Sequence, residues 1–187
     1  MQNVRQNSKV LFLVQSALFA AILCILSPLA IPIGPIPITL GVFAVMLTGV
    51  VLDWKRASVA VLVYILLGVI GLPVFSGGNS GLGVIAGPTG GYLWAYLPMA
   101  AMIAALGGKP QERELAEDWR AAAACLLSMV VLYVLGTFQF TLVADSSWGH
   151  ALSVCVYPFL PLDAGKAVCA TLLGVRIRRR LRAAGLL

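Results

Sequence analysis

The chain has 187 residues; 60% are hydrophobic, 11% are charged and the mean hydropathy is +0.97. Soluble domains carry about 25% charged residues, so this composition excludes a soluble enzyme and indicates an integral membrane protein. The formal net charge of +6 does not indicate nucleic-acid binding, because the basic residues alternate with apolar segments along the chain.

Six apolar segments, each near the ~20 residues that cross a bilayer as a helix, follow one another along the chain. They cover residues 10–30, 39–52, 57–72, 89–107, 119–143 and 161–180. Backbone groups in lipid must hydrogen-bond within their own segment, and these runs lack the alternating polarity of barrel strands. We therefore expect an all-α integral membrane protein, a six-transmembrane-helix bundle that forms one domain over residues 1–187.

Arg5 and Lys9 precede the first apolar segment, so residues 1–26 resemble a signal peptide. We favour a transmembrane helix, because the apolar core is long and further spans follow. This segment contains "ALFAA", in which Ala17 and Ala21 form a small-xxx-small pattern. Such a pattern lets transmembrane helices approach closely, although it is also common by chance. It marks a candidate packing face on the first helix.

The distribution of lysine and arginine predicts how the bundle is oriented. Twelve of the 13 basic residues precede the first span, lie between spans two and three or four and five, or follow span six. The connections after spans one, three and five contain none. Short loops rich in Lys and Arg mark the cytoplasmic side, so we expect both termini to be cytoplasmic. Lys166 is the exception.

Two of the predicted outer segments are more than simple connectors. Residues 29–40, "LAIPIGPIPITL", contain three prolines and should run extended or turn at the outer surface. Residues 71–92, between the third and fourth helices, are rich in glycine yet apolar between the glycines. A solvated linker would be polar. We expect this glycine-rich loop to fold against the mouth of the bundle, and its glycine content suggests a lid.

Prolines set the start of the last helix. Pro158 and Pro161 cannot lie inside an unbroken helix without a kink, whereas proline is tolerated in a first turn. We therefore expect the sixth helix to begin near Pro161 or Leu162 and to run to about Arg180. Residues 144–160 then form an outer connection with room for a short helix.

Asp163 and Lys166 lie three positions apart in the first turns of that helix, on one face. A purely structural reading is a mutually neutralising pair, since an unpaired charge in the bilayer costs at least ~2.5 kcal/mol. That reading does not explain why either charge is present. Intramembrane ionisable residues usually face a cavity and mark a ligand site, and an Asp acceptor beside a Lys donor suits a ligand with both N–H and C=O groups.

Asn79, within the glycine-rich loop, has two interpretations that composition alone does not separate. Its amide offers two donors and one acceptor that can point into the cavity below. Asparagine also tolerates left-handed backbone conformations and is common in turns.

Few residues favour catalysis or metal binding. The cysteines lie apart without CxxC spacing, at positions 24, 125, 155 and 169, which argues against a disulfide or metal framework. "GNSG", residues 78–81, is similar to the nucleophile motif of rhomboid intramembrane proteases, with Ser80 as nucleophile and His150 as base. However, Ser80 lies in a glycine loop, and His150 lies outside the sixth span. We predict no catalytic and no metal-binding residues.

Three stretches together resemble the BioY family, the biotin-specific S components of energy-coupling factor (ECF) transporters. They are "ITLGVFAVMLTGVVL", "GLPVFSGGNSGLGVIAGPTGGYL" and "PFLPLDAGKAV". The resemblance implies a six-helix membrane subunit of the prokaryotic plasma membrane that captures biotin from outside and has no enzymatic activity or cofactor. It also implies partnership with a transmembrane coupling subunit and two ATPase subunits.

The resemblance also assigns site residues. The polar contacts to the biotin head group that it implies are Asn79, Asp163 and Lys166. Candidate walls of the apolar slot for the rest of the vitamin are Phe75, Tyr92 and Tyr157. The family docks on its coupling subunit through an AxxxA pattern, which implies a partner interface at Ala17 and Ala21. Two alternatives remain, a stand-alone secondary transporter of another small molecule and the protease.

Overall fold

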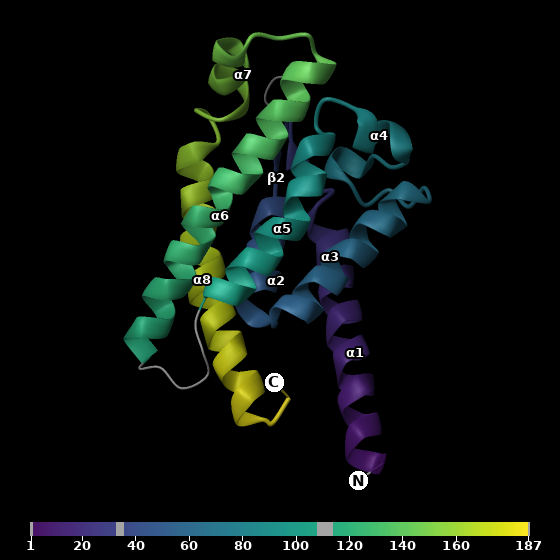
Figure 1. The fold of residues 1–187 in the computed structure, drawn as a ribbon, viewed down its shortest axis with the longest axis vertical. Helices are drawn as coiled ribbons and strands as arrows, with labels where there is room; N and C mark the ends of the chain where they lie inside the picture. The colour runs from purple at the N-terminus through teal and green to yellow at the C-terminus, as the bar shows by residue number, and fades with distance from the viewer. Residues whose placement is uncertain (1, 33–35, 108–113, 187) are drawn as a thin grey trace.

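The computed structural model describes residues 2–32, 36–107 and 114–186, with side chains for 9–32, 36–107 and 118–186. Helices make up most of this part of the chain (Figure 1). In chain order the elements are α1 (Gln2–Leu26), β1 (Ala30–Ile31), β2 (Ile38–Thr39), α2 (Gly41–Val51), α3 (Trp54–Val69), a 3-10 turn (Ser76–Gly78), α4 (Leu82–Ala86), α5 (Gly90–Leu106), α6 (Glu114–Val143), α7 (Trp148–Cys155) and α8 (Leu160–Ala183).

Each of the six predicted segments overlaps one helix, in order α1, α2, α3, α5, α6 and α8. The prediction of six full spans is not confirmed. Among the described helices, only Lys9–Leu26 within α1 and Asp118–Val143 within α6 are long and apolar enough to cross a membrane. A third span results if α7 and α8, bent by 48°, are counted together. α2 has 11 residues, about 16 Å, against a hydrocarbon core of about 30 Å.

α2 is short because it lies inside the bundle, where it packs against α5 and α8. Ten of its 11 residues are buried, as expected of a helix that is apolar all round. Gly174 of α8 permits the closest approach, since a Cβ there would lie 2.6 Å from the Val50 side chain of α2. The length of about 20 residues expected of a membrane-spanning helix therefore does not apply to this central helix.

The proline-rich segment contains the only strands in the described part of the chain, and the all-α prediction missed them. β1 and β2 pair antiparallel, with Ala30 opposite Thr39 and Ile31 opposite Ile38. The expectation of an extended or turning segment is confirmed for the residues described here. Residues 33–35, which include one of the three prolines, lie outside the described residues.

The break before the last helix follows the prolines. α7 ends at Cys155 and α8 begins at Leu160, with Pro161 in its first turn. The prediction of a short helix within 144–160, followed by a new helix near Pro161, is confirmed. α8 extends three residues beyond the predicted end at Arg180. Its first turns therefore hold Asp163 and Lys166 near the break.

The other end of α8 is fastened by its arginines. Arg178 is buried and donates from Nη1 to the Gly107 carbonyl oxygen at the end of α5, at 3.1 Å. Arg179 pairs with Asp118 of α6 at 2.7 Å. The basic tail thus joins three helices at the end of the bundle opposite α4 and α7 (Figure 1). Lys109, Arg113 and the side chain of Arg5, used in the orientation prediction, lie outside the described residues.

Candidate functional site

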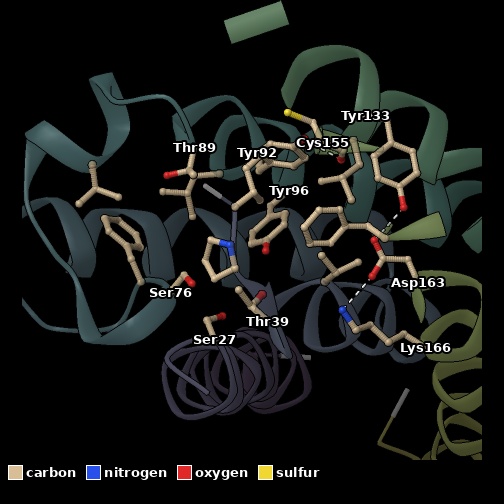
Figure 2. A pocket seen from close by; sticks show the side chains of 18 of the residues that line it. Ser27, Thr39, Ser76, Thr89, Tyr92, Tyr96, Tyr133, Cys155, Asp163 and Lys166 are labelled. Atoms are coloured by element: carbon tan, nitrogen blue, oxygen red, sulfur yellow. Dashed lines mark hydrogen bonds and ion pairs between the residues drawn. The ribbon is translucent and has the colours of Figure 1, made fainter. Parts of the chain in front are cut away.

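A cavity lies at the end of the bundle where α1 ends and α5 and α8 begin. It contains about 650 Å³ of space free of protein atoms, part of it open to solvent, which is within the range of small-molecule sites. Seven helices, α2 to α8, and the segments around β2 and the 3-10 turn contribute residues to it; Figure 2 shows many of these side chains. Its apolar lining includes Ile36, Val42, Phe75, Val84, Leu93, Leu132 and Phe159.

Asp163 and Lys166 are the charged residues among the described side chains that line this cavity. Lys166 Nζ lies 2.8 Å from Asp163 Oδ1. Asp163 is only 2% exposed, and its other oxygen, Oδ2, accepts a hydrogen bond from Tyr133 Oη at 2.9 Å (Figure 2). Both carboxylate oxygens thus have a partner, which offsets much of the cost of burying the charge.

The position of Asp163 in the helix adds to its stabilisation. It lies in the first turn of α8, where the free N–H groups and the helix dipole favour a negative charge. Lys166 has three N–H donors, and Asp163 accepts one of them. The pair therefore offers an ordered carboxylate and a lysine with remaining donors on one wall of the cavity.

Two of the three aromatic residues predicted as walls, Phe75 and Tyr92, line the cavity. Phe75 is fully buried, and its ring meets that of Tyr64 edge-on with centroids 5.7 Å apart. Tyr92 donates from Oη to the Cys155 carbonyl oxygen at 3.2 Å, which ties α5 to the end of α7. Packing therefore holds both rings in place.

Asn79 and Tyr157 do not line the cavity. Asn79 is exposed and donates from Nδ2 to the Ser76 carbonyl oxygen at 2.8 Å, directly after the 3-10 turn. This geometry fits the interpretation of Asn79 as a turn residue. Tyr157 is 66% exposed, in the break between α7 and α8. A ligand-binding role for these two residues stays a prediction.

The segment between α3 and α5 folds against the bundle. Gly81 N donates to the Gly68 carbonyl oxygen of α3 at 2.7 Å. From the other side, Gln139 of α6 donates from Nε2 to the carbonyl oxygens of Ile85 and Gly87, both at 2.8 Å. Gln139 thus satisfies carbonyl groups at the end of α4, next to the cavity-lining Val84 and Thr89. Whether this segment closes over a ligand stays a prediction.

Sequence reasoning missed Tyr133, Gln139 and a group of hydroxyl residues in the cavity. The hydroxyl residues are Ser27, Thr39, Tyr64, Ser76 and Tyr96. Tyr133 is 30 positions from Asp163, and Gln139 is more than 50 from the carbonyls that it binds. No local pattern marks such pairs. An isolated polar residue within an apolar span is the one signal that would have drawn attention to Gln139.

Ala17 and Ala21 lie on a face of α1 that contacts no other described element. Both are exposed, and so are the large apolar residues around them, namely Val10, Leu13, Val14, Leu18 and Ile25. The opposite face of α1 packs against α3. The small-xxx-small pattern therefore faces outward from the described part of the chain.

Residues 2–183 match the BioY family. The chain belongs to the BioY family. Among its relatives, it is 39% identical over 179 residues to "Biotin transporter BioY2" of Lactococcus lactis subsp. cremoris, covering 94% of each chain. It is 35% identical over 167 residues to "Biotin transporter BioY" of Thermotoga maritima, covering 89% of this chain and 95% of the other.

A solved structure supports the same assignment. It is the crystal structure of the S-component for biotin from an ECF-type ABC transporter, which shares 28% identity and superposes with a TM-score of 0.82. The match covers 92% of this chain and 93% of the other. The family is one of membrane transporters and not of enzymes, so neither the protease nor the secondary transporter of another small molecule is supported.

Proposed function

We propose that this chain is the substrate-binding S component of an ECF-type transporter and that its cavity binds biotin for uptake. The observation that carries the proposal is the buried Asp163–Lys166 pair on the wall of an otherwise largely apolar cavity. The BioY relatives and the S-component likeness support the same ligand. In this role the chain acts as one membrane domain and needs no cofactor.

The head group of biotin suits the charged wall. Its ureido ring has two N–H donors and one carbonyl acceptor. We infer that Asp163 accepts from a ureido N–H and that Lys166 donates to the carbonyl oxygen, while Tyr133 fixes the carboxylate of Asp163. The sulfur-containing ring and the aliphatic chain then pack against Phe75 and Tyr92. Apolar walls around a few placed polar groups are typical of small-molecule sites.

Asn79 and Tyr157 contribute to the site only if the bound state differs from the one described. For Asn79 to reach the ligand, its hydrogen bond to Ser76 must break and the 3-10 turn must swing inward. Ser76 and Phe75, at the start of that turn, already line the cavity. A short rearrangement of the glycine-rich segment would therefore bring Asn79 to the ligand and close the mouth.

We infer the orientation from the basic residues at one end of the bundle, and the partner interface from the exposed face of α1. The basic end, with both termini, is cytoplasmic, and the cavity opens to the outside of the prokaryotic plasma membrane. The exposed Ala17 and Ala21 face of α1 docks on the transmembrane coupling subunit, because small residues let two helices approach closely. Two ATPase subunits bound to the coupling subunit supply the energy for inward release.

The first test is calorimetric titration of biotin into the purified, detergent-solubilised protein, with thiamine as the control ligand. We expect biotin-selective binding by this chain alone. Asp163→Asn and Lys166→Met should each weaken biotin binding by about a hundredfold, since each leaves a desolvated partner unpaired.

A matched variant separates binding from folding. Asp118→Asn removes an ion pair of α8 at the opposite end of the bundle and should bind biotin as the wild type does. All variants are compared by gel filtration and thermal unfolding. Wild-type affinity in well-folded Asp163→Asn protein would contradict the proposed site, and a folded wild type that binds no biotin would contradict the function.

A further inference from the structure

The cavity has a second polar region, formed by neutral hydroxyl groups. Ser27 follows α1, Thr39 ends β2, Tyr64 lies on α3 and Tyr96 lies on α5. Figure 2 shows Ser27, Thr39 and Tyr96 gathered on one side of the cavity, apart from Asp163, Lys166 and Tyr133 on the other. The ring of Tyr64 lies beside that of Tyr96, with centroids 6.5 Å apart. Four segments far apart in the sequence therefore bring O–H groups to one place.

Two of these hydroxyls are deeply buried and lack a hydrogen bond. Ser27 is 2% exposed and Tyr64 is fully buried. The two hydroxyls lie near each other without meeting hydrogen-bond geometry, and neither has another partner among the described residues. Buried polar side chains are satisfied in the large majority of cases. Their arrangement here points to a polar group that binds from the cavity.

The geometry around Gly41 shows how closely the hydroxyls converge. A Cβ at this position, the first residue of α2, would lie 2.8 Å from Tyr96 Oη, 3.0 Å from Ser27 Oγ and 3.1 Å from Thr39 Oγ1. The absence of a side chain at Gly41 keeps this space open. Thr39 Oγ1 already accepts a hydrogen bond from Gly41 N at 3.0 Å, which leaves its own O–H proton available to donate.

A group that only accepts hydrogen bonds is the natural ligand for these hydroxyls. Each O–H can rotate to donate, and the charged residues on the described lining are Asp163 and Lys166, on the other side of the cavity. A carboxylate accepts several hydrogen bonds, and bonds to an ionised acceptor are about twice as strong as neutral ones. Apolar residues make up much of the remaining lining, as an aliphatic linker requires.

We propose that Ser27, Tyr64 and Tyr96, assisted by Thr39, bind the carboxylate at the far end of the ligand's aliphatic chain. This inference rests on the proposed function, in which Asp163 and Lys166 take the ureido ring. The hydroxyl group then sets the orientation of biotin in the cavity. It also gives selectivity for the free acid over neutral derivatives of the same shape.

The test compares biotin with biotinamide, in which a neutral amide replaces the carboxylate. Dissociation constants are measured for the wild type, Ser27→Ala and Tyr64→Phe, which keeps the ring packed against Phe75. Thr171→Val is the matched control, because Thr171 Oγ1 is also buried without a hydrogen-bond partner among the described residues but does not line the cavity. Folding is checked by thermal unfolding and by retained binding of biotinamide.

We expect Ser27→Ala and Tyr64→Phe each to weaken biotin about tenfold, as for loss of a charge-assisted hydrogen bond, and to leave biotinamide within about twofold. Equal losses for both ligands would overturn the proposal, because the hydroxyls would then contact the ring system. The proposal would also be overturned if Ser27→Ala and Tyr64→Phe changed biotin affinity no more than Thr171→Val does. The hydroxyls would then contact water and not the ligand. A wild type that binds neither ligand would instead refute the proposed function.

Discussion

α8 carries an ion pair near each end, and the two pairs differ in burial and in how far apart their partners lie in the sequence. Asp163 and Lys166 are one turn apart on the same helix, with side chains 3% and 12% exposed. Arg179 and Asp118 join α8 to α6, with side chains 30% and 42% exposed. Beside the second pair, Arg178 reaches α5. The buried pair joins two residues of the same helix and lies in the proposed ligand site. The contacts of Arg178 and Arg179 connect α8 to neighbouring helices and so stabilise the bundle.

Arg178 should give the largest effect on stability. Arg178→Met removes a buried charged donor from the Gly107 carbonyl oxygen at the end of α5, so the folded state should lose roughly 2 to 3 kcal/mol. The thermal unfolding midpoint in detergent measures this loss. Biotin affinity of the protein that remains folded should stay at the wild-type value. A fall in biotin affinity without a fall in the unfolding midpoint would show that the Arg178 contact influences the ligand site at the other end of α8.

Substitution of Tyr133 should weaken biotin binding and also lower the stability of the fold, because one oxygen of the buried Asp163 carboxylate loses its partner. Tyr133→Phe keeps the ring but removes the hydrogen bond to Asp163 Oδ2, so the carboxylate loses its fixed orientation. We expect biotin affinity to fall about tenfold, which corresponds to about 1.4 kcal/mol. Calorimetric titration measures the change. An unchanged affinity would show that Lys166 alone positions Asp163.

Gln139 should affect the rate at which ligand leaves. Gln139→Leu removes two hydrogen bonds that hold the end of α4, each worth about 1 kcal/mol, and loosens the segment that contains Val84 and Thr89. We expect biotin dissociation to become several times faster, measured by displacement of labelled ligand. Gln139→Glu cannot donate and should behave in the same way. Wild-type dissociation in both variants would argue against a lid in this segment.

Asp118 should give the smallest effect. Its ion pair with Arg179 is half exposed, and pairs of this kind contribute under about 1 kcal/mol. Asp118→Asn should therefore leave biotin affinity unchanged and lower the unfolding midpoint by a small amount that decreases in high salt. A large loss of stability would mean that this end of the bundle depends on the pair more than its exposure suggests.

Local patterns explain which parts of the fold could be predicted. Apolar runs and the prolines at 158 and 161 located the helices, because bilayer chemistry and helix geometry act within one segment. The length of α2 depends on its burial between α5 and α8, which no local pattern records. The β1 and β2 pair, at two residues each, depends on the chain returning across the intervening prolines.

The residues of the candidate site also separate into those that a local sequence pattern marks and those that it does not. Asp163 and Lys166 were found because two charges in an apolar stretch are visible in the sequence itself. Tyr133 and Ser27 were missed because a tyrosine or serine in or next to a membrane helix is ordinary until its partner is known. Composition left Asn79 open between a ligand contact and a turn residue, the family resemblance added Tyr157, and in the described conformation both are exposed.

α1 connects two surfaces for which we propose different roles. Its exposed face presents Ala17 and Ala21, and the residue directly after its end, Ser27, contributes a hydroxyl to the cavity. A shift of α1 caused by a docking helix would therefore displace Ser27. Such coupling is reciprocal: if docking weakens biotin binding by some factor, biotin weakens docking by the same factor. The vitamin-loaded and empty forms would then bind the proposed coupling subunit with unequal affinities.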